Sequence, residues 1–581
     1  MTKFNKVIKW CPIEIIIILI LLFLNNNFLK NEDQKITITG DGVGYYDYLP
    51  SLFIYHDFPS KNCNSSDEFS ERINNLNFYL DYKGHKLNKY PCGTAVFLSP
   101  FFYYAHLMAN LHGFDKNGFS KPFQKSVFYA AIFYLFLALI FLRKFLSLFN
   151  LSWFNIAFIQ VLAVFSTSLL NYTIYEPSFS HVYSFFAITT FMFLTKYFFL
   201  YKKPKYFLWA CFLLGLVIIL RQVNCLIILF IPFLAGSYKN LKDGIFIIFK
   251  KKSNLIIGFL IIISIISIQL LLWHYQTGKF FIYSYQGESF NFLNPAFFNI
   301  LISYRKGLFV YAPITFISLF GCYIFIKNKH FYLFITWLIF FIILTYILSS
   351  WHSWEYGCSY GLRAYIDFYA IFFILLAIFI ESINIWIKLF VIVISILTIP
   401  LDIIQTKQYK EYILHSYIMD EQKYWTVFLR LDDRFKGLVW KRTYTFNSQT
   451  TKNIFTKIIP DTRIEPNVNK QLFFEYSNNI KGFDRTNIIQ VSFDNEFCSE
   501  QDERVELTIN DSLNNKCYYY HNPPLIHFEE NGLNKFQQGV YNYELESINK
   551  DNNKKICLKI FSKDKEVILK NIKIKFLEYH I

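Results

Sequence analysis

Charged residues are scarce in this chain of 581 residues. Asp, Glu, Lys and Arg together make up 17% of it, whereas a soluble protein usually carries about 25%. Hydrophobic residues account for 54%, and runs such as 14–24, 255–273 and 331–348 approach the ~20 residues that cross the hydrocarbon of a bilayer. The composition therefore excludes an ordinary soluble protein and predicts an α-helical integral membrane protein.

Three other patterns are missing from the sequence. No small-residue cleavage site follows Leu24, so the first apolar run is predicted to remain as a span rather than to be removed as a signal peptide. No spacing of His and Cys is typical of a zinc site. The glycines within residues 40–47 lack the strand–loop–helix context of a nucleotide-binding loop.

The formal net charge of +16 is better explained by membrane topology than by nucleic-acid binding, because the basic residues cluster between apolar runs. Lys3, Lys6 and Lys9 predict a cytoplasmic N-terminus. A long outer loop, 30–124, then follows the first span. About eleven spans are predicted, at residues 14–24, 123–142, 153–170, 180–200, 207–220, 224–235, 255–273, 308–326, 331–348, 362–380 and 386–404.

This count places the basic loops 143–144, 202–205, 239–252 and 327–329 on the cytoplasmic side, as the positive-inside rule requires. Residues 94–111 are apolar enough for a further span, but counting them would put all those lysines outside. They are therefore predicted to form an interfacial or re-entrant helix.

The same topology gathers the unusual polar motifs on the outer face. They lie at residues 40–47, 90–94, 175–181, 221–224, 304–307, 351–357 and 360–363. Outer arginines and lysines near helix ends suit an anionic head group such as a lipid phosphate. Neighbouring carboxylates, tryptophans and tyrosines suit a sugar, because rings stack on its apolar face and polar groups bind its hydroxyls.

In their order along the chain, these motifs resemble those of polytopic glycosyltransferases of the GT-C fold, most closely the bacterial relatives of glycosyltransferase family 39. The resemblance covers residues 10 to 405. Asp41, followed by Tyr45 and Tyr46, resembles the acidic motif of the first outer loop. Residues 89–91 resemble the Lys-Pro-rich motif that comes later in that loop, and residues 220–221 resemble a helix-Arg-Pro turn.

The sequence departs from the family at two positions. Val223 stands in place of the usual proline, and Gly42 stands where many members have a second acid. The second departure puts a metal-binding role of the loop in doubt, so no cofactor is assigned and a divalent metal is left open.

The resemblance implies a single displacement with inversion at the anomeric carbon of a polyprenyl-phosphate sugar. A carboxylate deprotonates the acceptor hydroxyl, and basic side chains stabilise the departing lipid phosphate. Asp41 is the candidate base, and Asp47 the candidate supporting contact. Candidates for the phosphate are Arg221, Arg305, Lys306 and Arg363; candidates for sugar or acceptor are Glu176, His181, His352, Trp354 and Glu355; Tyr45, Tyr46 and Lys89 complete the substrate-binding set.

Several candidates have a structural alternative. Asp41 and Asp47 could cap a helix, and Arg305 and Lys306 could anchor the chain at lipid head groups. Trp354 could belong to an interfacial aromatic belt. His181 and His352 could be polar residues whose hydrogen bonds are satisfied within the protein, with no contact to a substrate.

The chain changes character after residue 404. Residues 405–470 are predicted to be a juxtamembrane linker with an amphipathic helix at 421–441. Residues 471–581 alternate in short runs separated by turn signals and predict a small all-β, sandwich-like domain outside the membrane. The predicted strands lie at 488–493, 504–509, 541–548, 555–561 and 566–577. This domain either binds the acceptor or acts as a scaffold.

Cys63–Cys92 and Cys498–Cys517 would be disulfides if the outer side is oxidising, although sequence alone does not settle the pairing.

Three functions are weighed for the whole chain. The first is a glycosyltransferase in the cytoplasmic membrane, with the lipid-linked donor and a lipid, glycan or protein acceptor as partners. The second is a transporter or flippase of a lipid-linked glycan, which would usually show internal repeats that this sequence lacks. The third is a non-catalytic scaffold that presents the β domain.

Overall fold

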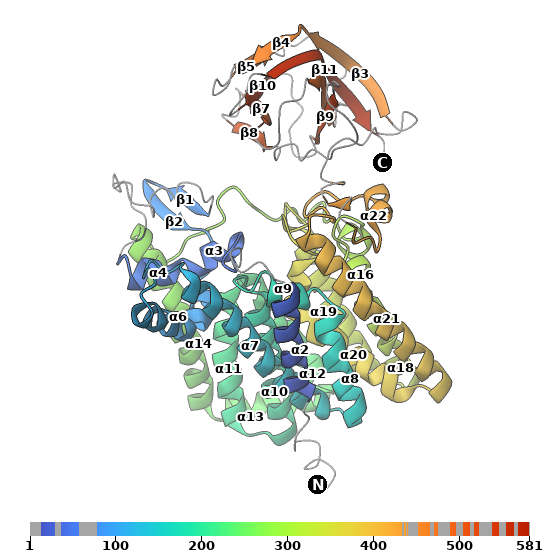
Figure 1. Cartoon of the computed structure of the whole chain (residues 1–581). Coiled ribbons are helices and arrows are strands. Elements are labelled where there is room, and N and C mark those ends of the chain that lie inside the picture. The colour runs from blue at the N-terminus through green and yellow to red at the C-terminus, as the bar shows by residue number, and fades with distance from the viewer. Residues whose placement is uncertain are drawn as a thin grey trace. The chain divides into compact units, whose positions relative to one another are not determined.

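The computed structural model divides the chain into two units, Met1–Leu431 and Asp432–Ile581 (Figure 1). The division falls inside the predicted linker. The residues described are 13–28, 36–56, 58, 78–432, 435–436, 439, 451–464, 470–474, 488–495, 503–511, 516–521, 537–544, 554–562 and 567–579.

The described part of the first unit is mostly helical and contains one small hairpin, formed by β1 (Tyr79–Tyr82) and β2 (His85–Asn88). Its N-terminal half contains α2 (Ile13–Phe28), α3 (Asp41–Tyr46), α4 (Tyr48–Phe53), α6 (Gly93–Leu111), α7 (Lys121–Ser147), α8 (Trp153–Phe165), α9 (Leu169–Ile174), α10 (His181–Tyr201), α11 (Pro204–Leu220), the 3-10 helix η2 (Gln222–Phe230) and α12 (Ile231–Ala235). Its remaining helices are α13 (Tyr238–Lys250), α14 (Lys252–Thr277), α15 (Asn299–Ile302), α16 (Leu308–Tyr311), α17 (Pro313–Ser318), α18 (Gly321–Lys327), α19 (Phe331–Ser349), the 3-10 helix η3 (Arg363–Phe368), α20 (Tyr369–Ser382), α21 (Ile385–Lys410) and α22 (Glu421–Val427).

Six segments of the described chain are long and apolar enough to cross a membrane: α7, α10, α14, α19, η3 with α20, and α21. Each coincides with a predicted span. At the other five predicted spans the apolar helices are shorter or broken, so the count of eleven is not confirmed. One bent pair, Gln222–Ala235 with Tyr238–Lys250, would raise the six to seven.

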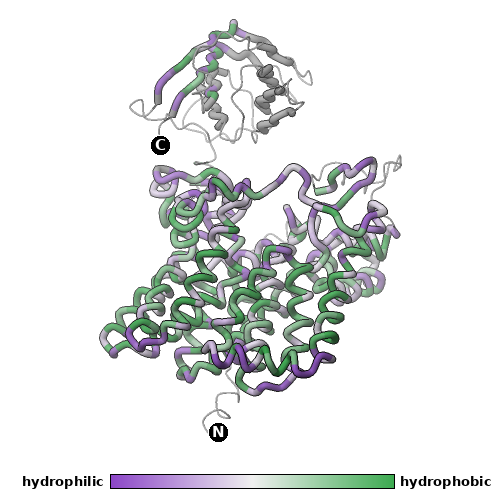
Figure 2. Tube along the Cα trace, turned by 180° about the vertical axis from the view of Figure 1, so that it is seen from behind, coloured by the Kyte–Doolittle hydropathy of each residue, from purple (hydrophilic) through white to green (hydrophobic). Residues whose placement is uncertain are grey.

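The outer surface of these helices is apolar, as lipid contact requires. On α14, Phe259 and Leu260 are 62% and 57% exposed, and on α21 Phe390 is 65% exposed. Hydrophobic residues run along the helices of the first unit, and hydrophilic residues gather at the helix ends (Figure 2). The chain is therefore a multi-pass membrane protein. Inside the bundle α10 packs against α7 and α11, and α11 packs against α14 (Figure 1).

Several predicted elements differ from the observed ones. The predicted cytoplasmic loop 239–252 is largely the helix α13, because the Ser237 side chain caps its first turn and Leu241 and Ile248 pack against the Phe198–Phe199 cluster. The predicted span 308–326 is broken into α16, α17 and α18, where Ala312 leaves the helical conformation before Pro313.

The predicted amphipathic helix 421–441 is also wrong in length. Among the described residues of this range, the α-helix covers only the seven residues of α22, because Phe428 is extended and Leu429 adopts a left-handed conformation (φ 56°). The Cys63–Cys92 disulfide is wrong as well, since Cys92 is a free, buried thiol. Cys498 lies outside the described residues, so the Cys498–Cys517 pairing stays a prediction.

The described strands of the second unit are antiparallel and form two sheets. The first has the order β5 (Lys470–Phe474), β10 (Lys554–Ser562), β7 (Glu503–Asp511), β8 (Lys516–His521). The second has the order β3 (Thr451–Ile459), β11 (Val567–Tyr579), β6 (Ile488–Asn495), β9 (Gln537–Glu544), with β4 (Thr462–Ile464) also pairing with β11. The five predicted strands match β6, β7, β9, β10 and β11. Because β3 and β4 fall in the predicted linker, the β region begins earlier than residue 471.

Candidate functional site

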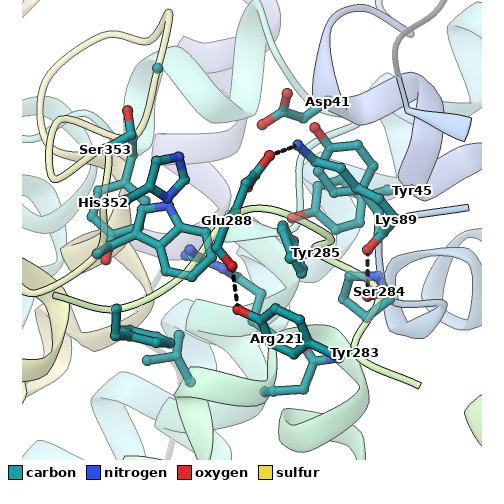
Figure 3. Close-up of a pocket in the computed structure, with 18 of the residues that line it drawn as sticks. Asp41, Tyr45, Lys89, Arg221, Tyr283, Ser284, Tyr285, Glu288, His352 and Ser353 are labelled. Carbon is teal, nitrogen blue, oxygen red and sulfur yellow. Dashed lines mark hydrogen bonds and ion pairs between the residues drawn. The ribbon is translucent and has the colours of Figure 1, made fainter. Parts of the chain in front are cut away.

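A pocket of about 490 Å³ lies where the polar ends of several helices and loops of the first unit meet (Figure 3). It receives residues from α3, from the start of α10, from the break between α11 and η2, and from η3. Two loops, 282–290 and 351–357, the segment 89–91 and Trp273 of α14 complete the wall. The lining residues that carry charge or can titrate are Asp41, Tyr45, Lys89, Tyr90, His181, Arg221, Tyr283, Tyr285, Glu288, His352, Tyr356 and Arg363.

Asp41 begins α3, directly after Gly40, whose positive φ of 53° turns the chain into the helix. One of its carboxylate oxygens lies 2.6 Å from Arg363 Nη1, and its side chain is 30% exposed. Burial acts to raise the pKa of Asp41, but the Arg363 guanidinium and a hydrogen bond from Tyr90 outweigh it and hold the pKa below its usual value. Asp41 is therefore an ionised carboxylate that faces the pocket.

Asp367 is a fully buried carboxylate behind the pocket wall. Its Oδ1 lies 2.8 Å from His181 Nδ1, and its Oδ2 lies 3.2 Å from Arg221 Nη1 and 2.8 Å from Asn224 Nδ2. Arg221 reaches it because the chain is extended at this residue, between the end of α11 and the start of η2. One carboxylate thus ties together α10, the α11–η2 break and η3.

Lys89 forms the third ion pair of the pocket. Its ammonium group lies 2.6 Å from a carboxylate oxygen of Glu288 (Figure 3). It also lies 5.5 Å and 5.4 Å from the ring centroids of Tyr90 and Tyr285. The Ser284 hydroxyl donates to the Lys89 carbonyl at 2.8 Å, which fastens the 282–290 loop to the end of the hairpin.

Aromatic rings form a continuous series along the pocket. Tyr45 contacts Tyr90 with ring centroids 4.7 Å apart, Tyr90 contacts Tyr285 at 6.3 Å, and Tyr285 contacts Trp351 at 5.7 Å. The His352 ring lies 4.9 Å from that of Trp351. Rings beside charged groups can hold a ligand that has both apolar faces and polar edges.

The structure brings seven of the candidate residues together around this pocket and places the other seven elsewhere in the described chain. Those that line it are Asp41, Tyr45, Lys89, His181, Arg221, His352 and Arg363. Those that do not are Tyr46, Asp47, Glu176, Arg305, Lys306, Trp354 and Glu355.

The seven residues away from the pocket brace its surroundings. Asp47 accepts hydrogen bonds from Tyr79 at 2.6 Å and Ser51 at 3.0 Å, and the Tyr46 hydroxyl donates to the Gly118 carbonyl at 2.5 Å. Glu176 accepts from Tyr409 and Asn171, and burial raises its pKa.

Arg305 and Lys306 hold the 351–360 loop. Arg305 pairs with Glu355 at 3.5 Å and lies 6.0 Å from the Trp354 ring. Lys306 is buried and donates to the Ser359 and Ser416 carbonyls, and burial lowers its pKa to about 7. Their role in this structure is to join loops.

The sequence reasoning missed two acids of the site, Asp367 and Glu288. Asp367 follows Arg363 by one helical turn inside an apolar run, and an ionisable residue in such a run is itself a signal of function. Glu288 lies in an irregular loop, with no pattern around it. For a metal ion the donor set is poor, since Asp41 is flanked by Arg363 and Tyr90, and the described residues contain no group of three or more His, Cys, Asp or Glu side chains that could hold one.

No protein-family model matches the chain, and no curated protein matches it. Among solved structures the chain is similar to the arabinosyltransferase EmbB from Mycobacterium smegmatis, with a TM-score of 0.33 and 8% sequence identity. The match covers 93% of this chain and 64% of that chain. A likeness at this TM-score does not establish a shared fold.

Proposed function

We propose that this protein is a glycosyltransferase that moves a sugar from a polyprenyl-phosphate donor to an acceptor hydroxyl at the outer face of the cytoplasmic membrane. The observation that supports this most strongly is that Asp41, Arg221 and Arg363 line one pocket together with Lys89. Residues that are far apart in the sequence thus supply a carboxylate and three cations to one cavity. This agrees with the resemblance of the motifs to GT-C enzymes.

In the proposed reaction Asp41 accepts the proton of the acceptor hydroxyl, whose oxygen attacks the anomeric carbon. The bond between that carbon and the phosphate oxygen breaks on the opposite side of the sugar, so the configuration inverts. The electron pair leaves with the lipid phosphate, and Arg221, Arg363 and Lys89 stabilise the charge on it.

The polar end of the bundle is the natural place for this chemistry. A prenyl tail can stay in hydrocarbon beside the exposed apolar surface of helices such as α14, while the phosphate and sugar enter the pocket. The aromatic series from Tyr45 to Trp351 offers rings against which the sugar can pack.

The test replaces the proposed base. Asp41→Asn keeps the shape of the side chain, and we expect it to lower transfer by at least about 100-fold, which is the lower end of the contribution of a general base. Asp81→Asn, in β1 of the same loop but outside the pocket lining, is the matched control and should keep activity.

Activity is measured by mass spectrometry of envelope glycolipids and glycans from a deletion strain that carries each variant. Near wild-type transfer by folded Asp41→Asn protein would rule out Asp41 as the base. Movement of a labelled lipid across proteoliposome membranes without any sugar transfer would instead support the flippase alternative.

A further inference from the structure

Asp367 bonds two pocket residues of different chemistry, His181 and Arg221, through its two oxygens. We propose that Asp367 is a positioning residue that fixes the tautomer of His181, so that His181 Nε2 accepts a hydrogen bond from a hydroxyl of the sugar or acceptor. This inference rests on the proposed function, because that function supplies the hydroxyl. It assigns His181 to a hydroxyl and not to the phosphate.

The hydrogen-bond inventory around Asp367 supports this tautomer. Arg221 and Asn224 both donate to Oδ2, so this carboxylate already serves as an acceptor for two N–H groups. A carboxylate without a proton has nothing to donate, so the 2.8 Å contact of Oδ1 with His181 requires the proton to be on Nδ1. In the neutral ring Nε2 then carries the lone pair.

The surroundings keep the His181 ring in place. The ring contacts Tyr172 at 4.8 Å and is stacked on Phe179 at 6.3 Å. His181 lines the pocket although only 3% of its side chain is exposed. With Nδ1 occupied by Asp367, Nε2 is the ring nitrogen that remains for a ligand.

The unprotonated Nε2 selects its partner by chemistry. It can accept from an O–H group, but a phosphate oxygen also only accepts and would be repelled. Arg221, which shares the same carboxylate, presents its remaining N–H groups and therefore suits phosphate oxygens. Asp367 thus places an acceptor for a hydroxyl beside a donor for an anion, which suits a sugar phosphate that carries both groups.

Two substitutions of His181 separate the proposed role from a structural one. His181→Asn can still donate to Asp367 but has no group at the position of Nε2. His181→Gln can place its amide oxygen near the position of Nε2 but gives up the bond to Asp367. We expect His181→Asn to lose about 100-fold in transfer and His181→Gln to lose about tenfold. The opposite order, with His181→Asn the more active, would show that His181 serves only to satisfy Asp367.

A second measurement needs no transfer activity, and its main readout comes from the wild-type protein. The ¹⁵N resonances of the imidazole nitrogens in the full-length protein report the tautomer, and the His181 signals are identified by their loss in His181→Gln. Between pH 6 and 8 we expect Nδ1 to be protonated and Nε2 to be unprotonated. The opposite tautomer in the wild-type protein would overturn the proposal.

Addition of farnesyl phosphate, a prenyl phosphate without a sugar, should leave the His181 ring neutral. Conversion to the imidazolium form on binding this probe would show that His181 is a phosphate ligand and would also overturn the proposal. Asp367→Asn should mix the two tautomers. Asp402→Asn, which changes another buried carboxylate outside the pocket lining, should not. These spectra decide the proposal even if the protein transfers no sugar.

Discussion

Replacement of Gly42 by alanine should displace Asp41, the proposed base, without changing the Asp41 side chain itself. Gly42 is buried in the first turn of α3, next to Asp41. A Cβ atom at Gly42 would lie 1.9 Å from Ser178 Oγ, 2.6 Å from Ser178 Cβ and 3.0 Å from the Ser178 carbonyl carbon. The helix therefore packs directly against the backbone of the 175–181 turn.

The expected loss of stability and activity depends on how far the atoms around Gly42 can move. Ser178 is fully buried, so neither partner can move into solvent, and overpacking of this kind costs about 1–3 kcal/mol of the free energy of unfolding. If α3 shifts by about 1 Å to relieve the contact, Asp41 moves with it. A misplacement of that size can lower a rate about 100-fold.

The assay is a double-mutant cycle. Gly42→Ala, Ser178→Gly and the double variant are compared by intrinsic-fluorescence thermal unfolding in detergent and by sugar transfer. Ser178→Gly removes both atoms of the closest contacts and costs about 0.5–1 kcal/mol through backbone entropy. In the double variant we expect recovery of about 1 kcal/mol or more relative to additivity.

Two results would refute this reasoning. The first is a Gly42→Ala protein that is as stable and active as the wild type. The second is additivity of the two substitutions within about 0.5 kcal/mol, which would mean that they do not share the contact.

Two further predictions concern the ion pairs of the pocket. In Arg363→Met, Asp41 loses the largest of the effects that oppose its burial, so its pKa should rise. Because the proposed base must be ionised, the acid limb of the kcat/KM pH profile should move upward by about one unit or more. An unmoved limb would contradict the coupling. Glu288→Gln removes the carboxylate that competes for Lys89, so farnesyl phosphate should bind about 3- to 10-fold more tightly in low salt, with less gain in high salt. The control is Glu411→Gln, whose partner Lys407 lies outside the pocket lining; an equal gain there would point to net charge instead.

The sequence allowed part of the site to be predicted because two rules act over long distances. The positive-inside rule assigned each loop to a side, which grouped Asp41, Arg221 and Arg363 before any contact was known. The second rule is that a helix in lipid must be apolar along its length. Runs of apolar residues therefore located the six long spans.

The rest of the site depends on contacts that leave no such signal. Asp41 and Asp47 looked equivalent in one short motif, yet six residues of helix rotate the chain by about 600°, which places Asp47 on another face, where Tyr79 and Ser51 hold it. Arg305 and Glu355 both looked suited to a ligand, but they satisfy each other across two loops. Such pairing is decided by tertiary structure.

The charges of the pocket constrain what can bind in it. Among the described lining residues each Lys or Arg is paired with a carboxylate: Lys89 with Glu288, Arg221 with Asp367 and Arg363 with Asp41. An anion therefore meets a nearly neutral pocket and must share or displace a carboxylate, which costs part of its binding energy. A bare phosphate gains little under these conditions, whereas a phosphate joined to a sugar also gains contacts with the rings and with His181. The paired cations thus favour a ligand whose charge and hydroxyls arrive together, and a phosphate that leaves without its sugar loses the contacts that helped to hold it.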